Sequence, residues 1–281
     1  MTGSTRGFGR AISEEVLARG HRLAAASREP ERLRPLVQKD PERVLALRLD
    51  VTDPEAARRA VDQAVSHFGR LDVVVSNAGY GHVGAVEELS DEEHREQLAV
   101  NLFGVMNVTR AALPHMRRQR SGHLVQMSSL NGVEGLAGGA TYAASKFAVE
   151  GWSESLAEEV APFGIDVTIV EPGPHRTHFL HDGSVKWAAE IPDYADSVGK
   201  VREMLRQMDG AQPGDPSRAA RLIMEVVEAN EPPLRLPLGH MALDHIRARL
   251  RAQLEELEAW AEVGAKSDFP DARRPARQRS S

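Results

Sequence analysis

The chain has 281 residues, of which 41% are hydrophobic and 27% are charged, a balance ordinary for a folded globular protein. Its net charge of −6 gives no reason to expect a nucleic-acid partner, and the absence of any cysteine excludes disulfides and thiol catalysis. No apolar run reaches the roughly 18 residues of a membrane helix and no signal-peptide pattern is present, so we expect a cytoplasmic protein without a membrane partner.

The length suits one α/β domain, which we place at 1–265, with a disordered tail at 266–281. The basic end of this tail is expected to be solvated, although such a tail can also contact an acidic partner.

A glycine-rich loop from Thr2 to Gly9 opens the chain and leads into an amphipathic helix that ends near Gly20. Its glycines permit positive φ and let backbone N–H groups approach a phosphate at the start of the helix, although a plain turn explains them about equally well. Such a loop normally follows a central strand of about five residues. Only Met1 precedes it here, so we expect the first strand to be missing because the start is truncated or misassigned. The alternative is a chain that lacks the strand and binds its cofactor poorly.

Short apolar segments then alternate with helical patterns. Strands are predicted at 23–26, 44–49 and 71–75, and a helix at 54–67 begins on Pro54. The segment 71–75 is almost continuously apolar, which is typical of a parallel strand buried on both faces. This alternation predicts an α/β protein with a parallel sheet.

The middle of the chain contains a long helical pattern at 90–113, which Ser90 is suited to cap. Asn101 lies inside this pattern although asparagine is a mediocre helix former. A strand at 124–127 follows and ends at Ser128 and Ser129, of which Ser129 is the better candidate for a catalytic hydroxyl.

A helix predicted at 141–160 carries Tyr142 and Lys146. Residues four apart lie on one helix face, so the ammonium should sit beside the phenol and lower its pKa from about 10. The pair then forms an acid/base group at neutral pH, and an ordinary helix surface is the alternative.

The last part contains a strand at 167–170, a helix at 216–227, an edge strand at 232–239 and an amphipathic helix at 243–257. Between them, apolar residues from Trp187 to Met208 recur at steps of four and three and predict one helical seam, whose regular part begins near Pro192. We interpret 178–210 as a lid over a lipophilic pocket, with Tyr194 and Met208 facing the substrate. Plain core packing explains the seam about equally well.

Five elements in this order resemble the classical short-chain dehydrogenase/reductase family over roughly residues 2–240. They are a TGxxxGxG loop at 2–9, an Asn-Ala-Gly element at 77–79, the asparagine at 101, a serine thirteen residues before a Tyr-x-x-x-Lys motif, and a Pro-Gly turn at 172–173. The motif alone is common by chance, whereas the ordered set is specific. The resemblance implies a doubly wound parallel sheet, the Rossmann fold, with strand order 3-2-1-4-5-6-7 and its strand 1 missing.

The resemblance also implies an oxidoreductase that moves a hydride between the nicotinamide of NAD(P) and an alcohol or ketone carbon. Tyr142 is expected to exchange a proton with the substrate oxygen, and Ser129 to hydrogen-bond that oxygen. Lys146 is expected to lower the pKa of Tyr142 and to hold the ribose hydroxyls. Asn101 is expected to hold a water of the proton relay, unless it is only a polar helix residue.

Cofactor contacts are implied along the same elements. They are expected at Gly3, Thr5, Arg6, Gly7, Phe8, Gly9, Arg28, Asp50, Val51, Asn77, Ala78, Gly79, Tyr142, Lys146, Pro172, Gly173 and Thr177. No acid precedes Arg28 at the end of strand 23–26, and arginine at this place accommodates the 2′-phosphate of NADP. We therefore favour NADP(H) over NAD(H). Two observations oppose this preference: Arg6 and Arg28 could simply be solvated, and Glu29 is an acid just beyond Arg28. For 77–79, an ordinary strand-to-loop turn is the alternative to a cofactor contact.

In the family, the helices that correspond to 90–113 and 141–160 pack against their copies, which implies a homodimer or homotetramer.

His175, His178 and His181 have a spacing that suits a metal, but no matching carboxylate or cysteine set is evident, so we expect a polar loop and no metal. A nonenzymatic NAD(P)-binding sensor is the alternative function, disfavoured because all four catalytic positions hold the required residue types. An epimerase of the same broad fold is disfavoured by the glycine spacing and the short length.

Overall fold

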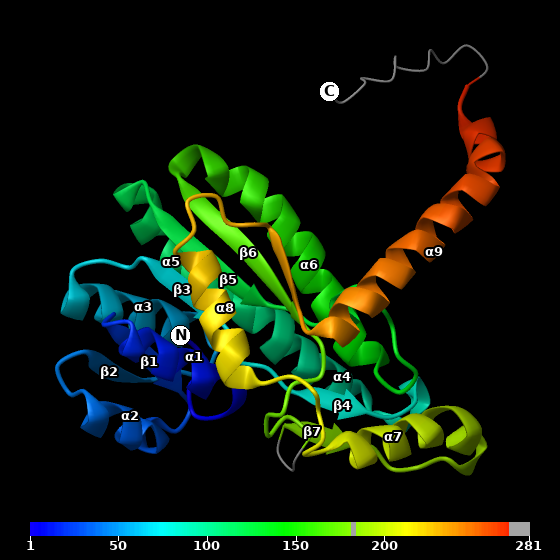
Figure 1. The fold of residues 1–281 in the computed structure, drawn as a ribbon, viewed down its shortest axis with the longest axis horizontal. Coiled ribbons are helices and arrows are strands. Elements are labelled where there is room, and N and C mark those ends of the chain that lie inside the picture. The colour runs from blue at the N-terminus through cyan, green and yellow to red at the C-terminus, as the bar shows by residue number, and fades with distance from the viewer. Residues whose placement is uncertain (181–183, 270–281) are drawn as a thin grey trace.

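The computed structural model describes residues 1–180 and 184–269 (Figure 1). Its main strands are β1 (Leu23–Ser27), β2 (Val44–Arg48), β3 (Val73–Ser76), β5 (Gly122–Met127), β6 (Ile165–Pro172) and β8 (Arg235–Leu238). All neighbours are parallel, in the orders β2-β1 and β3-β5-β6-β8. Residues 1–3 lie between β1 and β3: Thr2 forms a parallel bridge with Ala26, and its N–H donates to the carbonyl oxygen of Val75 over 3.0 Å. The predicted strands and their order are confirmed, with residues 1–3 in the place of the first strand.

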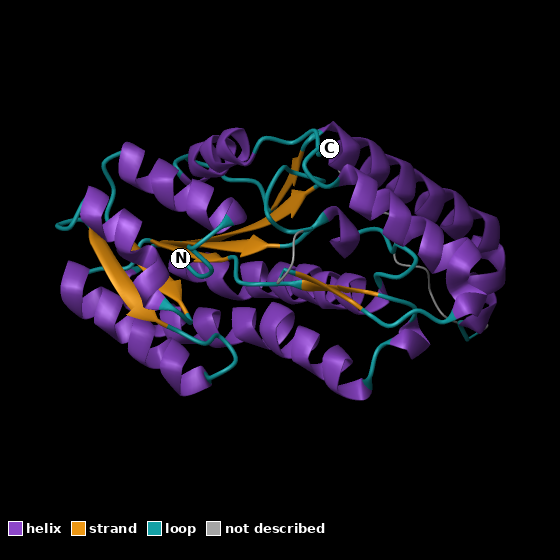
Figure 2. Cartoon of the chain, turned by 90° about the horizontal axis from the view of Figure 1, so that it is seen from below, coloured by secondary structure: helices purple, strands orange, loops and turns teal. Residues whose placement is uncertain are grey.

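Helices lie on both sides of this sheet (Figure 2). On one face the sheet is covered by α3 (Pro54–Phe68), α5 (Gly104–Gln119) and α6 (Ala140–Val160), and on the other by α1 (Gly7–Ala18) and α8 (Pro216–Val227). The short α2 (Arg34–Lys39) lies beside β2. Successive side chains of β5 point to opposite faces of the sheet. Leu124 packs with α3 and α5, while Val125 packs with Ile12 and Ile223. The sheet is therefore buried on both sides, as its apolar strands predict.

The long helical pattern at 90–113 is not one regular helix. α4 (Asp91–Leu98) begins on Ser90, whose hydroxyl accepts from the N–H of Glu93 over 3.3 Å. A π-helical turn, Ala99–Phe103, joins α4 to α5, and Asn101 lies at its centre. Such turns insert an extra residue into a helix and often occur at functional sites.

The segment between β6 and α8 departs from the prediction. Trp187 does not begin a helix but ends β7 (Val185–Trp187), which pairs in parallel with β4 (Gly81–Val83). The helical part begins with the turn Pro192–Tyr194, passes through a π turn and continues as α7 (Lys200–Met208). The predicted helix is therefore wrong before Pro192, because residues 185–187 gain backbone partners about a hundred positions away that periodicity does not register.

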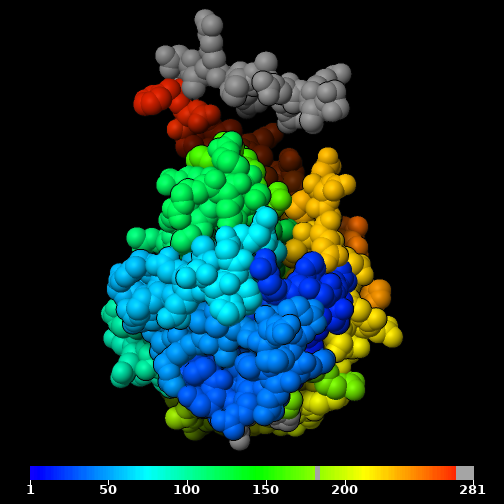
Figure 3. Space-filling model, turned by 90° about the vertical axis from the view of Figure 1, so that its left-hand side faces the viewer, coloured from blue at the N-terminus to red at the C-terminus, as the bar shows by residue number. Residues whose placement is uncertain are grey.

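The last helix, α9 (His240–Gly264), exceeds the predicted 243–257 at both ends and points away from the body (Figures 1 and 3). Ala242 and Ile246 are its buried residues, and residues 247–269 are all exposed. A 3₁₀ turn, Ala265–Ser267, extends it, so 266 and 267 are helical rather than disordered. The predicted tail from 270 lies outside the described residues, as does His181. Among the described helices, none combines the length and apolar character needed to cross a bilayer.

Candidate active site

The carboxyl ends of the parallel strands meet at one edge of the sheet and open into a cavity of about 1290 Å³. Seventeen of the nineteen predicted site residues line it: Gly3, Thr5, Arg6, Gly7, Phe8, Arg28, Asp50, Val51, Asn77, Ala78, Gly79, Ser129, Tyr142, Lys146, Pro172, Gly173 and Thr177. Pockets for drug-sized ligands measure about 300–1,000 Å³, so this one has room for a dinucleotide together with a substrate.

Gly9 and Asn101 do not line the cavity. A Cβ at Gly9 would collide with the carbonyl oxygen of Gly3, so this glycine closes the turn instead of touching a ligand. Asn101 is fully buried, and its side-chain nitrogen donates to the carbonyl oxygen of Tyr80 over 2.8 Å and to the hydroxyl of Ser145 over 3.1 Å. Its side-chain oxygen accepts from the N–H of Tyr80 over 3.1 Å. Asn101 thus fixes the chain just after the Asn-Ala-Gly element.

Tyr142, Ser129 and Lys146 come together at the floor of the cavity, as the sequence predicts. α6 carries Tyr142 and Lys146 on one face, and Ser129 follows the end of β5, near enough to the phenol to affect its pKa. The ammonium of Lys146 is 5.7 Å from the centre of the Tyr142 ring and donates to the carbonyl oxygen of Met127 over 2.8 Å. The ring of Phe179 lies against Tyr142, with 5.8 Å between ring centres.

The charge balance of this group differs from the prediction. Burial raises the pKa of Tyr142, and the hydrogen bond with Ser129 only opposes that shift. Burial also lowers the pKa of Lys146 to about 8, against the charge of Glu150, which acts to raise it. The expected lowering of the tyrosine pKa is therefore wrong in direction, because desolvation of the phenol outweighs its polar contacts.

The glycine loop is shaped to receive a phosphate group. Gly3 and Gly7 have φ of 67° and 54°, a conformation that side-chain-bearing residues rarely adopt. α1 begins at Gly7, which lines the cavity, and the N-cap residue Arg6 makes no side-chain cap hydrogen bond to its first N–H groups. Thr177 lies over Gly7 at the opposite wall. Uncapped N–H groups at a helix start suit the pyrophosphate of a dinucleotide.

Asn77 holds this loop in position. Its backbone N–H donates to the hydroxyl of Thr2 over 2.9 Å, and its side-chain nitrogen donates to the carbonyl oxygens of Thr2 and Gly3. The N–H of Ala78 donates to the same hydroxyl over 3.0 Å. The Asn-Ala-Gly element is therefore more than an ordinary turn, since it ties β3 to the glycine loop.

Positive side chains gather at the cavity end near β1 and β2. Arg6, Arg28 and Arg32 all line it, and Arg32 was not predicted. Glu29 pairs with Arg32 over 2.7 Å, so the acid that weakened the argument for NADP has its own cation. Burial acts to raise the pKa of Asp50, but hydrogen bonds from Thr52 and the charge of Arg28 lower it overall. Asp50 is thus a carboxylate at neutral pH, oriented by Thr52.

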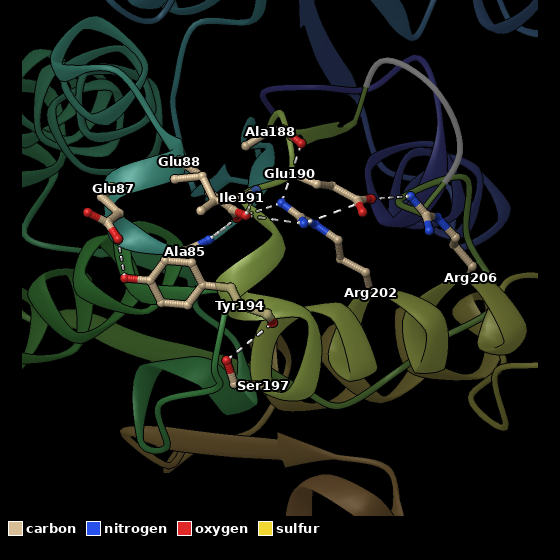
Figure 4. A network of polar contacts seen from close by, with 10 residues as sticks. All are labelled: Ala85, Glu87, Glu88, Ala188, Glu190, Ile191, Tyr194, Ser197, Arg202 and Arg206. Atoms are coloured by element: carbon tan, nitrogen blue, oxygen red, sulfur yellow. Dashed lines mark hydrogen bonds and ion pairs between the residues drawn. The ribbon is translucent and has the colours of Figure 1, made fainter.

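α7 covers the opposite end of the cavity and is held by a buried ion pair (Figure 4). The guanidinium of Arg202 is 2.7 Å from the carboxylate of Glu88, and their side chains are 2% and 0% exposed. Glu88 also accepts from the N–H groups of Ala85 and Ile191. Tyr194 points away from the cavity and donates to Glu87 over 2.6 Å, so its predicted contact with substrate is wrong. Met208 lines the cavity, as predicted.

Two carboxylates that the sequence analysis passed over lie behind the site. The Arg235 guanidinium is 3.2 Å from Glu150 and 3.7 Å from Glu171, and both acids are buried. Burial raises the pKa of both, and the charge of Glu150 helps to bring the pKa of Glu171 to about 7. The position of Glu150, four residues after Lys146 on the same helix face, was the signal available in the sequence.

Of the three histidines, His175 and His178 are among the described residues. His175 is bonded through Nδ1 to the carbonyl oxygen of Gly173 over 2.9 Å, and its ring packs 5.0 Å from that of Phe8. It therefore supports the Pro-Gly turn. His178 lines the cavity.

Comparison with known proteins agrees with this geometry. The family model for short chain dehydrogenases matches residues 1–185. The chain is 40% identical over 268 residues to oxidoreductase BOA17 of Botryotinia fuckeliana (strain B05.10), covering 95% of this chain and 97% of that protein. It is 36% identical to a 3-ketodihydrosphingosine reductase of Bacteroides thetaiotaomicron, over 85% of this chain and 86% of that protein.

Solved structures give the same result. A short-chain dehydrogenase from Streptomyces avermitilis superposes with a TM-score of 0.89 at 41% identity, covering 95% of this chain and 98% of that one. An alcohol dehydrogenase from the archaeon Thermococcus sibiricus, in complex with 5-hydroxy-NADP, has a TM-score of 0.69 at 26% identity, covering 85% and 94%. The chain therefore belongs to the short-chain dehydrogenase/reductase family. It is an NAD(P)-dependent oxidoreductase.

Proposed function

We propose that this protein interconverts an alcohol and a ketone on a lipophilic substrate with NADP(H). The observation that carries the proposal is the meeting of Tyr142 and Ser129 in a cavity whose two ends differ in character. One end gathers arginines, and the other is apolar. A dinucleotide and an apolar substrate would occupy these ends with their reacting atoms beside Tyr142.

The side chains have distinct roles in this proposal. The phenol of Tyr142 gives its proton to the carbonyl oxygen, and a raised pKa keeps that proton in place at neutral pH. The hydroxyl of Ser129 donates to the same oxygen and holds the substrate in register. When bound, the nicotinamide supplies the hydride. Lys146 is assigned to hold the ribose hydroxyls, and the water-mediated relay through Asn101 stays a prediction.

Apolar side chains support a lipophilic substrate. Those that line the cavity around Tyr142 and beneath α7 are Leu130, Leu136, Phe179, Leu180, Met204, Leu205, Met208 and Met241. Methionine adapts its shape to irregular apolar ligands. One relative is named as a reductase of 3-ketodihydrosphingosine, which is in keeping with such a substrate.

NADP(H) is the proposed cofactor because cations outnumber free acids at the β1 end of the cavity. Among the described residues, the Arg28 guanidinium makes no ion pair, whereas Glu29 is paired with Arg32. A 2′-phosphate needs such a cation, and the carboxylate that would hold a ribose 2′-hydroxyl is missing from the end of β1.

We also infer a homo-oligomer built on α5 and α6. Phe103 and Phe147 are 55% and 43% exposed, although phenylalanine is usually buried. Phe103 ends the π turn just before α5 and Phe147 lies on α6, and α5 and α6 belong to the helices through which family resemblance implies subunit contact. A cytoplasmic location remains part of this proposal.

Replacing Tyr142 by Phe tests the proposed chemistry. We expect turnover of a lipophilic ketone with NADPH to fall by about 10²–10⁴-fold, because the substrate oxygen loses its proton donor. The Kd for NADPH, measured by fluorescence titration, should stay nearly unchanged. Tyr194→Phe is the matched control, since Tyr194 bonds Glu87 outside the cavity, and it should keep full activity. Substantial turnover by the Tyr142→Phe variant would refute the role of the phenol.

A further inference from the structure

The projecting part of α9 lacks a partner in the described chain. Its first turns are anchored, since Ala242 and Ile246 are buried and Met241 and His245 line the active-site cavity. Residues 247–269, in contrast, are all exposed, and α9 projects from the rest of the fold (Figure 1). Most of the stability of a helix in a protein comes from packing an apolar face. A contact with a further partner would therefore stabilise this stretch.

An apolar seam runs along the exposed helix. Leu250, Leu254, Leu257 and Trp260 are 54%, 57%, 64% and 65% exposed, far more than such side chains usually are. They continue from Ile246 at steps of four and three residues, the spacing with which two helices pack in a coiled coil. The seam is thus shaped to receive another helix.

Charged residues beside the seam are separated by sign along α9. The first half carries Arg247, Arg249 and Arg251, and the second half carries Glu255, Glu256, Glu258 and Glu262. At 3.6 residues per turn, Arg247, Arg251, Glu258 and Glu262 share one flank of the seam. Within the described chain, Arg247 pairs with Asp244 over 3.1 Å and the other three form no ion pair.

We propose that α9 pairs in antiparallel orientation with α9 of a second copy of this chain. With the pair centred between Leu254 and Glu255, Arg251 of each copy lies opposite Glu258 of the other, and Arg247 lies opposite Glu262. The apolar seam supplies the affinity, and the charges select the orientation. A parallel pair would place arginines beside arginines and glutamates beside glutamates. This contact is separate from the one inferred for α5 and α6.

A membrane surface is the competing occupant, and the charges disfavour it. Helices that lie on membranes carry Lys and Arg on their polar face, which anionic lipids attract. Here the half with Trp260 is flanked by glutamates, which anionic lipids repel. A second copy satisfies the same glutamates with its own arginines.

Single cysteines test the contact directly, because the chain contains none. The Leu254→Cys variant should form a disulfide-linked dimer under mild oxidation, since its two thiols would lie near the centre of the pair. Ala252→Cys, on the outer face of α9, is the matched control and should stay monomeric on a non-reducing gel. Leu250→Cys should also fail to link to itself, because antiparallel packing separates its two copies by about 13 Å along the helix axis.

Charge reversal then tests the orientation in the Leu254→Cys background. The variants Arg247→Glu/Arg251→Glu and Glu258→Arg/Glu262→Arg each bring like charges together, so each alone should show at least a tenfold slower cross-linking. When the two charge-reversal variants are mixed in equal amounts, they should cross-link to each other about as fast as the Leu254→Cys variant without charge changes. In such a mixed pair, the glutamates of one copy again lie opposite the arginines of the other. Mass spectrometry of the linked dimers distinguishes the mixed product.

Three outcomes would overturn the proposal. Cross-linking of the Leu254→Cys variant no greater than that of Ala252→Cys would show that the helices do not meet. Equal cross-linking of the Leu250→Cys and Leu254→Cys variants would indicate a parallel pair. Sedimentation of the chain with phosphatidylcholine/phosphatidylglycerol vesicles, accompanied by loss of the disulfide link in the Leu254→Cys variant, would assign the seam to a membrane.

Discussion

Arg28 is the side chain on which the proposed cofactor preference depends. Its guanidinium lines the cavity at the end of β1, and the nearby Glu29 is neutralised by Arg32. A hydrogen bond to a charged group contributes about 1.5–3 kcal/mol, which corresponds to roughly ten- to a hundredfold in affinity.

Replacing Arg28 by Ala should therefore raise the Kd for NADPH by about ten- to a hundredfold and leave that for NADH within about threefold. Fluorescence titration of both cofactors measures this difference. Arg22→Ala, at the opposite end of β1, is the control and should bind NADPH normally, since its guanidinium bonds the carbonyl oxygen of Phe68. Equal losses for both cofactors would argue against a 2′-phosphate contact.

Glu171 couples the stability of the protein to pH. Its carboxyl is 1% exposed, and burial together with the charge of Glu150 raises its pKa from 4.5 to about 7, despite the opposing charge of Arg235. Between these pH values the folded chain holds more protons at this position than the unfolded chain, so stability falls as pH rises. The shift corresponds to a loss of about 3 kcal/mol across the window.

Glu171→Gln removes this titration, so we expect the variant to gain stability relative to wild type between pH 5 and pH 8, by about 2.5 kcal/mol. Urea unfolding at both pH values gives the difference. Glu225→Gln replaces an exposed glutamate of α8 and serves as the control. Parallel pH profiles for wild type and Glu171→Gln would show that the carboxyl titrates normally.

At the scale of elements, α7 is fixed to the body by charge as well as by apolar packing. Arg202 is buried against Glu88 (Figure 4), while Arg206 is exposed and 3.5 Å from Glu190. Removing one member of a buried pair leaves an uncompensated charge, which costs about 3–5 kcal/mol, whereas an exposed pair contributes about 1 kcal/mol or less.

Arg202→Met should therefore lower the free energy of unfolding by about 3 kcal/mol and raise KM for a lipophilic substrate more than it lowers kcat, because α7 carries Met204, Leu205 and Met208. Arg206→Met is the matched control and should change stability by less than about 1 kcal/mol. Adding Glu88→Gln to Arg202→Met should restore part of the stability. If Arg202→Met alone were as stable as wild type, the buried ion pair would not be what holds α7 in place.

The elements also show where sequence reasoning succeeds. Helix geometry is local, so the sequence predicts correctly that Tyr142 and Lys146 lie together. The alternating patterns predict the parallel sheet, while its strand order is implied by the family resemblance. β4 and β7 were missed because three-residue strands have too little periodicity and their pairing spans about a hundred positions. Arg202 was missed because isolated charges are ordinarily solvated, and only the fold brings Glu88 to it. The pKa direction at Tyr142 failed for a related reason: burial depends on distant segments.

For the whole molecule, the cavity joins segments that are far apart in the sequence. The cavity is bordered by the glycine loop, by the ends of β3, β5 and β6, and by α7. A ligand that fills it therefore contacts segments from the N-terminal loop to α7. Anything that binds only the folded state adds about 2.7 kcal/mol at a concentration of 100 times Kd.

Saturating NADPH should consequently raise the melting temperature by roughly 5–8 °C, with a smaller effect from NADH at the same concentration. Differential scanning fluorimetry measures both shifts. The Tyr142→Phe variant should show the NADPH shift undiminished, which separates binding from chemistry. An unchanged melting temperature with either cofactor would contradict the assignment of the cavity to the dinucleotide.

The π turn at Ala99–Phe103 limits how far the joined helices α4 and α5 can be stabilised by evolution or by design. Deleting Val100 would restore an unbroken α-helix with more regular hydrogen bonds, and a screen for heat resistance would favour such a change. The deletion would also rotate α4 against α5 by about 100° and carry the Asn101 amide away from Tyr80 and Ser145. Selection for a more stable helix therefore opposes selection for the position of the Asn101 amide. The π turn keeps this amide beside Tyr80 and Ser145 at the expense of helix rigidity.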